Sequence, residues 1–125
     1  MKVPLIRSAI AAAILMAGTS MLPSQPSPQT GRIPQFENSE VSVWKTAILP
    51  NQPLTMHTHE HPRVIVALAG GDIKIVTESG SSETRHWDTG KAYWLSADEG
   101  KKRHADVNTG HAPIEVMVVE LKNAH

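Results

Sequence analysis

From Ile33 onward, apolar and polar residues alternate with a period of two, and no segment shows the 3.6-residue period of an amphipathic helix. The apolar runs end at clusters of Gly, Pro, Asn, Asp and Ser, which are the residue types that form turns. Turn clusters recur every ~8–12 residues, as is typical of a β-sandwich or β-barrel. The pattern therefore predicts an all-β fold of seven or eight short strands, of which the clearest are Val41–Leu49, Arg63–Leu68, Ile73–Thr77, Thr84–Trp87, Lys91–Leu95, Arg103–Asn108 and Ile114–Lys122.

The last of these strands is apolar on both faces. Ile114, Val116 and Val118 alternate with Met117 and Val119, so each side of the strand presents large apolar side chains. A strand of this kind is covered on both sides. We expect one face to lie inside the barrel and the other against a second layer or a second subunit, which makes the protein a candidate homodimer.

The first segment of the chain is expected to lie outside the fold. Lys2 and Arg7 precede an uncharged apolar run from Ser8 to Leu22, which is the arrangement of a secretory signal peptide and is shorter than the ~20 apolar residues of a membrane span. We predict a signal peptide over residues 1–22, a flexible Pro-containing linker over 23–35, and a β-barrel over 36–122. The protein is then periplasmic or secreted, with no membrane contact beyond the signal peptide.

Composition excludes several classes of function. The 125 residues contain 12 Lys+Arg, 12 Asp+Glu and no Cys. The absence of Cys excludes disulfide frameworks, thiolate metal sites and Cys nucleophiles. A net charge of zero, which becomes about −2 once Lys2 and Arg7 are removed with the signal peptide, provides no basic field for nucleic acid.

Histidine is the unusual residue, because three of the seven lie within one pentapeptide. In an extended chain, His57, His59, His61 and Arg63 all point to the same side. Two imidazoles two residues apart on one strand face can both bind a divalent metal. Imidazole ligands suit Zn, Cu, Fe and Ni, and additional carboxylates favour Mn. The remaining histidines stand alone and are expected outside the site; they are His86, His111 and His125.

The spacing of these residues resembles the first motif of the cupin superfamily, G-x5-H-x-H-x3,4-E-x6-G. His57 and His59 fill the H-x-H positions, and Gly70 fills the closing position. Asn51 stands at the first glycine position, and Asn is the common substitute for Gly where a turn requires positive φ. Arg63 stands where the motif has its acid.

A second motif, G-x5-P-x-G-x2-H-x3-N, is matched in part. His104 and Asn108 fill its last two positions, whereas Gly100 lies one residue too early and the proline is absent. The resemblance covers about residues 41–121. It implies a single-domain cupin β-barrel, that is, a double-stranded β-helix or jelly roll, with one metal held by His57, His59 and His104.

Arg63 leaves the fourth metal ligand open, because a guanidinium is always charged and cannot bind a metal. His61 or Glu60 can supply that ligand. Alternatively, Arg63 turns outward and pairs with Asp106 or Glu60. In a third interpretation the pocket holds no metal, and Arg63 binds a carboxylate or phosphate together with the histidines.

Function is therefore expected in one of two classes. The cupin resemblance implies a metal-dependent enzyme of the dioxygenase, isomerase or decarboxylase type, with Glu60 and Arg63 as candidate catalytic residues and Fe, Mn, Zn, Ni or Cu as the metal. The alternative is a metal-free cupin that binds a small polar or anionic molecule, or a dimerising scaffold without catalysis. Tyr93 and Trp94 are the favoured candidates for aromatic residues that line the pocket.

Overall fold

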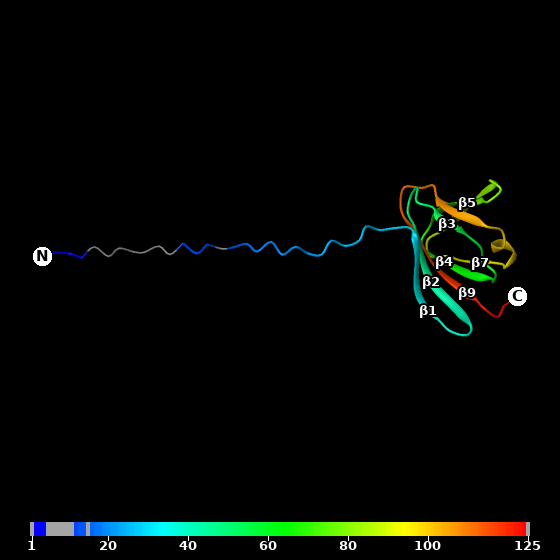
Figure 1. Ribbon diagram of the computed structural model, residues 1–125, viewed down its shortest axis with the longest axis horizontal. Helices are drawn as coiled ribbons and strands as arrows, with labels where there is room; N and C mark the ends of the chain where they lie inside the picture. The colour runs from blue at the N-terminus through cyan, green and yellow to red at the C-terminus, as the bar shows by residue number, and fades with distance from the viewer. Residues whose placement is uncertain (1, 5–11, 15, 125) are drawn as a thin grey trace.

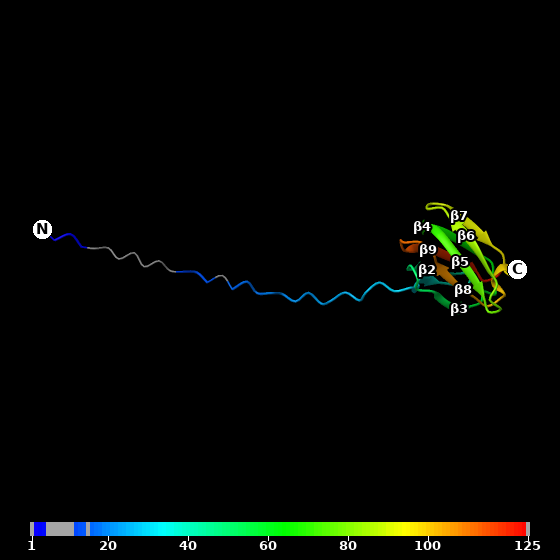
Figure 2. The same ribbon diagram turned by 90° about the horizontal axis from the view of Figure 1, so that it is seen from above.

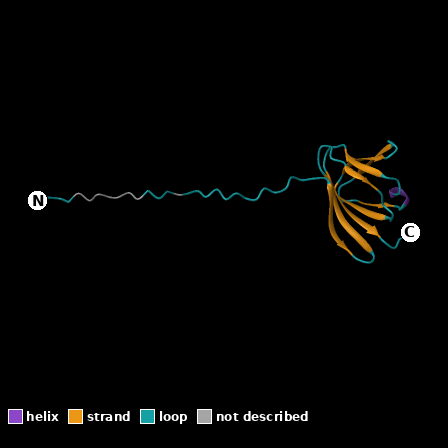
Figure 3. Cartoon of the chain, viewed as in Figure 1, coloured by secondary structure: helices purple, strands orange, loops and turns teal. Residues whose placement is uncertain are grey.

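The computed structural model describes residues 2–4, 12–14 and 16–124, and the fold is all-β (Figures 1 and 3). These ranges contain nine strands and one short 3₁₀ helix, η1. Each of the seven predicted strands is present, with ends that differ by at most two residues. The elements are β1 (Gly31–Glu37), β2 (Val41–Ile48), β3 (Leu54–His57), β4 (Arg63–Ala69), β5 (Gly71–Thr77), β6 (Ser82–Trp87), β7 (Ala92–Leu95), η1 (Asp98–Gly100), β8 (His104–Asn108) and β9 (Ile114–Leu121).

The strands form two antiparallel sheets that face each other (Figure 2). One sheet has the order β1-β2-β9-β4-β7, and the other has the order β3-β8-β5-β6. Strands that are far apart in the sequence are therefore neighbours, as β2 and β9 are over their whole length. This interleaving of early and late strands is the jelly-roll arrangement. It also brings the segment around residue 57 beside the segment around residue 104.

The core lies between the sheets. On β9, Ile114, Val116 and Val118 are 1–4% exposed, whereas Met117 and Val119 on the opposite face are half-buried. The expected two-sided strand therefore has its inward face fully covered. Each fully buried side chain of this size contributes roughly 1.5–3 kcal/mol of transfer free energy.

The sequence pattern does not predict β1 or β3. β1 begins at Gly31, which lies inside the predicted linker 23–35, so the linker is shorter than expected. The strand lies at the edge of its sheet and its residues after Gly31 are exposed. Its sequence therefore lacks the alternation of apolar and polar residues from which a strand is predicted. Pro34 is tolerated there because an edge strand leaves one row of backbone groups unpaired. β3 has only four residues, too few to produce a recognisable period.

The predicted signal peptide over residues 1–22 includes residues 1, 5–11 and 15, which lie outside the described residues. Residues 16–30 lead away from the sheets without helix or strand (Figures 1 and 2). Within the described ranges, no helix has the length and apolar character needed to cross a membrane.

Two turn positions behave as the cupin motif requires. Asn51 has a φ of 58°, the left-handed conformation for which Gly and Asn are the usual residues. Gly70 lies so close to β6 that a Cβ atom there would approach the carbonyl oxygen of Trp87 to 1.9 Å. Only glycine fits at this position without displacing the backbone.

Candidate metal centre

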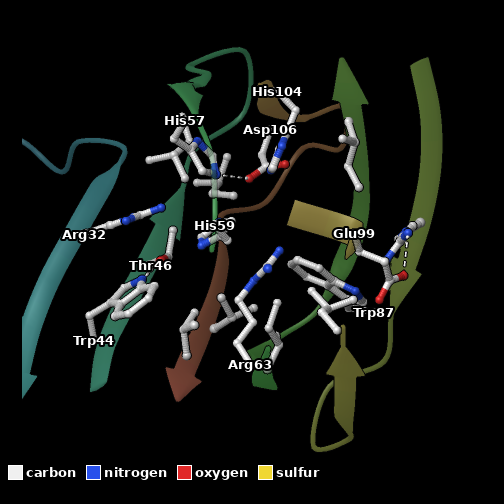
Figure 4. A pocket seen from close by; sticks show the side chains of 18 of the residues that line it. Arg32, Trp44, Thr46, His57, His59, Arg63, Trp87, Glu99, His104 and Asp106 are labelled. Atoms are coloured by element: carbon white, nitrogen blue, oxygen red, sulfur yellow. Dashed lines mark hydrogen bonds and ion pairs between the residues drawn. The ribbon is translucent and has the colours of Figure 1, made fainter. Parts of the chain in front are cut away.

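A cavity of about 70 Å³ lies between the two sheets and is lined by both polar and apolar side chains (Figure 4). Its polar wall contains His57, His59, His104 and Asp106, and its apolar wall includes Ile65, Leu95, Trp87 and Val118. The volume accommodates roughly five water-sized groups. The three histidines named by the cupin resemblance therefore line one cavity.

Two of these histidines are neighbours across a strand pair. His57 on β3 is opposite His104 at the start of β8, and their ring centroids are 4.5 Å apart. His59 lies two residues beyond β3, where its backbone N–H donates to the carbonyl of Gly100 at 2.8 Å. His59 and His104 are 7% and 5% exposed, and His57 is half-buried.

One nitrogen of each of the three rings lies within 4.8 Å of the corresponding nitrogens of the other two. Nδ1 of His57 is 2.7 Å from the carbonyl oxygen of Thr55, and Nδ1 of His104 is 2.7 Å from that of Lys102. A carbonyl oxygen only accepts, so each Nδ1 carries the hydrogen and each Nε2 keeps a free lone pair. Such backbone bonds are how proteins orient imidazole ligands for a metal. The donor set therefore fits a divalent transition metal.

Two of the three rings, those of His57 and His59, are poor sites for a proton. Burial is the main cause that lowers the pKa of His59 to about 2, and the charge of Arg63 lowers it further. Burial also lowers the pKa of His57 below its ordinary value, while the nearby carboxylate of Asp106 opposes that shift. Neutral imidazole is the form that binds a metal. His57 and His59 are thus held in the neutral, metal-binding form near neutral pH.

Arg63 faces the cavity and does not turn outward. It is the first residue of β4, where it shares the inward face with Ile65 and Ala67, and it is 6% exposed. In Figure 4 its guanidinium points into the cavity between His59 and Trp87. Among buried side-chain polar atoms of the described residues, Nη1 of Arg63 is the one without a hydrogen-bond partner.

Two carboxylates lie beside the triad: that of Glu120, whose Oε2 is 3.8 Å from Nδ1 of His59, and that of Asp106. Asp106 lies two residues after His104 on β8, and its Oδ2 is 3.5 Å from Nε2 of His57. Asp106 is one of the two partners expected for an outward-turned Arg63, but the structure records no ion pair between these residues. Because alternate residues of a strand share a face, the spacing of His104 and Asp106 is the sequence signal for this arrangement.

The other candidates lie elsewhere. The structure does not bring His61 or Glu60 into the cavity: Glu60 is exposed, and His61 is half-buried in the loop between β3 and β4. The alternation that places His61 beside His59 fails because β3 ends at His57. The described histidines His86 and His111 also lie outside the lining, as expected.

The pocket aromatics differ from the expected pair. Trp44 and Trp87 line the cavity, whereas Trp94 is 57% exposed. The Trp44 ring is parallel to that of His59, with centroids 6.4 Å apart. Arg32 of β1 also lines the cavity and lies over Trp44, with Cζ 4.9 Å from the ring centroid. The sequence offers no signal for Arg32, because the residue falls in the segment predicted as a linker.

Comparison with known proteins supports the architecture. No family model matches this sequence, and no curated protein matches it either. Among solved structures, a cupin domain from Bordetella pertussis Tohama I has a TM-score of 0.66 at 21% identity, over 79% of this chain and 99% of that chain. An RmlC-like cupin with a double-stranded β-helix fold from Methanocaldococcus jannaschii has a TM-score of 0.58 at 10% identity, over 78% and 84%.

A double-stranded β-helix protein from Klebsiella pneumoniae is similar at the same level, with a TM-score of 0.58 and 18% identity over 82% of this chain and 85% of that chain. The chain therefore has the cupin fold, as its motifs predict. Within that fold, it carries a cluster of three histidines that can hold a metal ion.

Proposed function

We propose that this protein is an exported cupin that binds a divalent transition metal through His57, His59 and His104, together with a small anionic ligand. The observation that carries the proposal is the convergence of three ring nitrogens in one cavity, two of them with the hydrogen fixed on the far side of the ring. A bound metal would supply a Lewis acid that polarises an oxygen-containing ligand. The reaction, if the protein is an enzyme, belongs to the cupin dioxygenase, isomerase or decarboxylase classes.

The residues around the triad have separable roles in this proposal. Asp106 contributes negative charge beside His57 and offsets part of the charge of a dication. Trp44 and Trp87 exclude water from the cavity walls. Arg63 provides the positive group that orients an anion. Glu60, the other candidate catalytic residue, is exposed and has no position in the cavity from which to move a proton.

Elemental analysis of the purified, tag-free protein tests the metal proposal. We expect close to one transition-metal ion per chain, and a higher melting temperature when Zn²⁺, Fe²⁺, Mn²⁺, Ni²⁺ or Cu²⁺ is added to the metal-free protein. If no metal copurifies and none of these ions raises the melting temperature, the metal-free cupin becomes the better account.

Export is supported by the sequence of residues 1–22 alone. N-terminal sequencing of the protein recovered from the producing cell tests this part. We expect the first residue of the mature chain to fall between about residue 19 and residue 26. A chain that still begins at Met1 in the cytosolic fraction contradicts export and leaves the metal proposal untouched.

A homodimer is the proposed assembly. On the outward face of the five-stranded sheet, Val64 pairs in register with both Val119 and Trp94. Together with Met117 these side chains form an apolar surface, and covering such a surface is favourable. Sedimentation equilibrium tests the proposal: a dimer is expected, and a Trp94→Glu variant should be monomeric. A monomer for the unmodified protein at micromolar concentration argues against it.

A further inference from the structure

Arg63 carries an unpaired hydrogen-bond donor. This side chain is 94% buried, since its exposed fraction is 6%, and its Nη1 has no hydrogen-bond partner. A buried donor without a partner is costly, because it has lost its hydrogen bonds to water and has gained none from the protein. Because the Arg63 side chain also lines the cavity, a ligand from outside the chain can supply the missing partner.

The carboxylates of the protein itself do not fill this role. Asp106, Glu120 and Glu99 are close enough to oppose the lowering of the Arg63 pKa that burial causes. None of the three, however, lies within hydrogen-bond distance of Nη1. Glu99 instead accepts a hydrogen bond from Arg85 at 3.1 Å. The protein therefore surrounds Arg63 with negative charge at a distance while its donor stays free.

The free donor lies next to the histidine triad. Gly100 of η1 packs against both: a Cβ atom built on Gly100 would lie 2.5 Å from the Cβ of His59 and 2.9 Å from Nη1 of Arg63. Arg63 and the three histidines line the same cavity, so an anion bound there by the guanidinium lies beside the three rings. Arg63 fills the sequence position at which the motif has its acid, and the anion would bring a negative charge next to that position.

Size and charge select the class of anion. The cavity holds roughly five water-sized groups, so it suits a ligand of about five non-hydrogen atoms. A planar carboxylate matches the planar edge of a guanidinium. A phosphate dianion would bring a second negative charge toward Asp106, Glu99 and Glu120, which all surround Arg63. A small monocarboxylate fits both the size of the cavity and the limit of one negative charge.

We propose that the cavity binds a small monocarboxylate between Arg63 and the histidine triad, and that this anion and a metal at the triad bind cooperatively. The first half of the proposal concerns the metal-free protein. The second half rests on the proposed metal site. Because binding coupling is reciprocal, each ligand is expected to raise the affinity of the other by the same factor.

Calorimetric titration of the full chain tests the first half, with glycolate as the carboxylate and inorganic phosphate and acetamide as comparison ligands. Glycolate should bind the metal-free protein more tightly than phosphate, and acetamide should not bind. Arg63→Met should weaken glycolate binding by about tenfold or more, which is the effect expected from losing hydrogen bonds between charged groups. Arg63→Lys keeps the charge but not the planar pair of N–H donors, so its glycolate affinity should lie between those of the unmodified protein and Arg63→Met.

Lys91→Gln is the matched control, because it removes one positive charge from an exposed residue that does not line the cavity. Its glycolate affinity should equal that of the unmodified protein. If Arg63→Met does not fold, as judged by circular dichroism, the Arg63→Lys comparison carries the test. If the folded Arg63 variant (Met, or Lys where Met does not fold) binds glycolate as tightly as the unmodified protein, the proposal is overturned. Tighter binding of phosphate than of glycolate by the unmodified protein also overturns it.

Zn²⁺ titration with and without glycolate tests the second half. The Zn²⁺ affinity of the unmodified protein should rise with glycolate, and this rise should be absent in the Arg63→Met variant. If Zn²⁺ binds but glycolate leaves its affinity unchanged, the cooperative half is wrong and the metal site stands. If Zn²⁺ does not bind at all, the proposed function fails, and the glycolate titration of the metal-free protein still decides the role of Arg63.

Discussion

His57 and His104 face each other across the β3–β8 pair, with ring centroids 4.5 Å apart and each Nδ1 2.7 Å from a backbone carbonyl. The two backbone bonds place both Nε2 atoms toward the cavity before any ligand arrives. This preorganisation is what distinguishes the site from a group of surface histidines. His59, which lies in the segment just after β3, completes the cluster.

Asp106→Asn should weaken metal binding without removing it. The variant keeps the shape of the side chain but loses the negative charge 3.5 Å from Nε2 of His57. A loss of about 10–100-fold in Zn²⁺ affinity is expected, as for other groups that support metal ligands. Competition with a chelator of known affinity measures the change. Asp72→Asn, at an exposed carboxylate bonded to His86, is the control and should have no effect.

Arg63→Met should stabilise the metal-free protein. The substitution replaces a buried guanidinium that has a free donor with an apolar side chain of similar length. We expect the free energy of unfolding in urea to rise by about 1–3 kcal/mol. Arg63→Lys keeps the buried charge and should bring no such gain. A Met variant less stable than the unmodified protein would mean that the surrounding carboxylates already compensate Arg63.

Acid should destabilise the metal-free protein through His59. The pKa of this residue is about 2 in the folded protein and about 6.5 in the unfolded chain, so the unfolded chain binds the extra proton between these values. The free energy of unfolding then falls as pH decreases below about 6.5, by up to about 1.4 kcal/mol per pH unit. Urea denaturation at about pH 7 and about pH 5 measures the loss.

The share of this loss that belongs to His59 is isolated by a His59→Gln variant. The variant should lose up to about 2 kcal/mol less than the unmodified protein over the same interval, since glutamine does not titrate. Equal pH dependence in the two proteins would show that His59 is protonated in the folded state as readily as in the unfolded chain.

Gly100→Ala should disturb both the metal ligand His59 and the anion-binding residue Arg63. A methyl group at this position would lie 2.5 Å from the Cβ of His59 and 2.9 Å from Nη1 of Arg63, so one of them must move. We expect a loss of about 1–3 kcal/mol in stability from overpacking, together with weaker Zn²⁺ and glycolate binding. Gly31→Ala is the matched control, because nothing lies within 4 Å of its Cβ position. Unchanged Zn²⁺ and glycolate affinity in the Gly100→Ala variant would show that the packing of η1 does not position the site.

The strands that the sequence predicts are those with a clear inward face. β9 and β4 alternate buried and half-buried residues, and both are recognisable as strands before the structure is known. β1 is missed because every residue after Gly31 is exposed and Pro34 interrupts the pattern, although this strand delivers Arg32 to the cavity. Edge strands carry little periodic signal, since only part of their surface is buried.

The histidine triad is predictable because its spacing is local within each motif. The sequence does not predict which residues of β7 face inward. This strand has aromatic or apolar side chains on both faces, and the sequence favours Tyr93 and Trp94 equally. The structure directs Leu95 inward and leaves Trp94 57% exposed. The free donor of Arg63 also escapes sequence reasoning, because it depends on where carboxylates from three other elements come to lie.

Calorimetric titration of the metal-free protein with Zn²⁺ tests the central claim most directly, when it compares the unmodified chain with a His57→Ala/His104→Ala double variant. We expect one Zn²⁺ per chain for the unmodified protein and for a His111→Ala control, whose side chain is exposed and outside the cavity. The double variant should bind no Zn²⁺, since losing two ligands exceeds the ~100-fold cost of losing a supporting group. One Zn²⁺ per chain bound with unchanged affinity by the double variant would contradict the account.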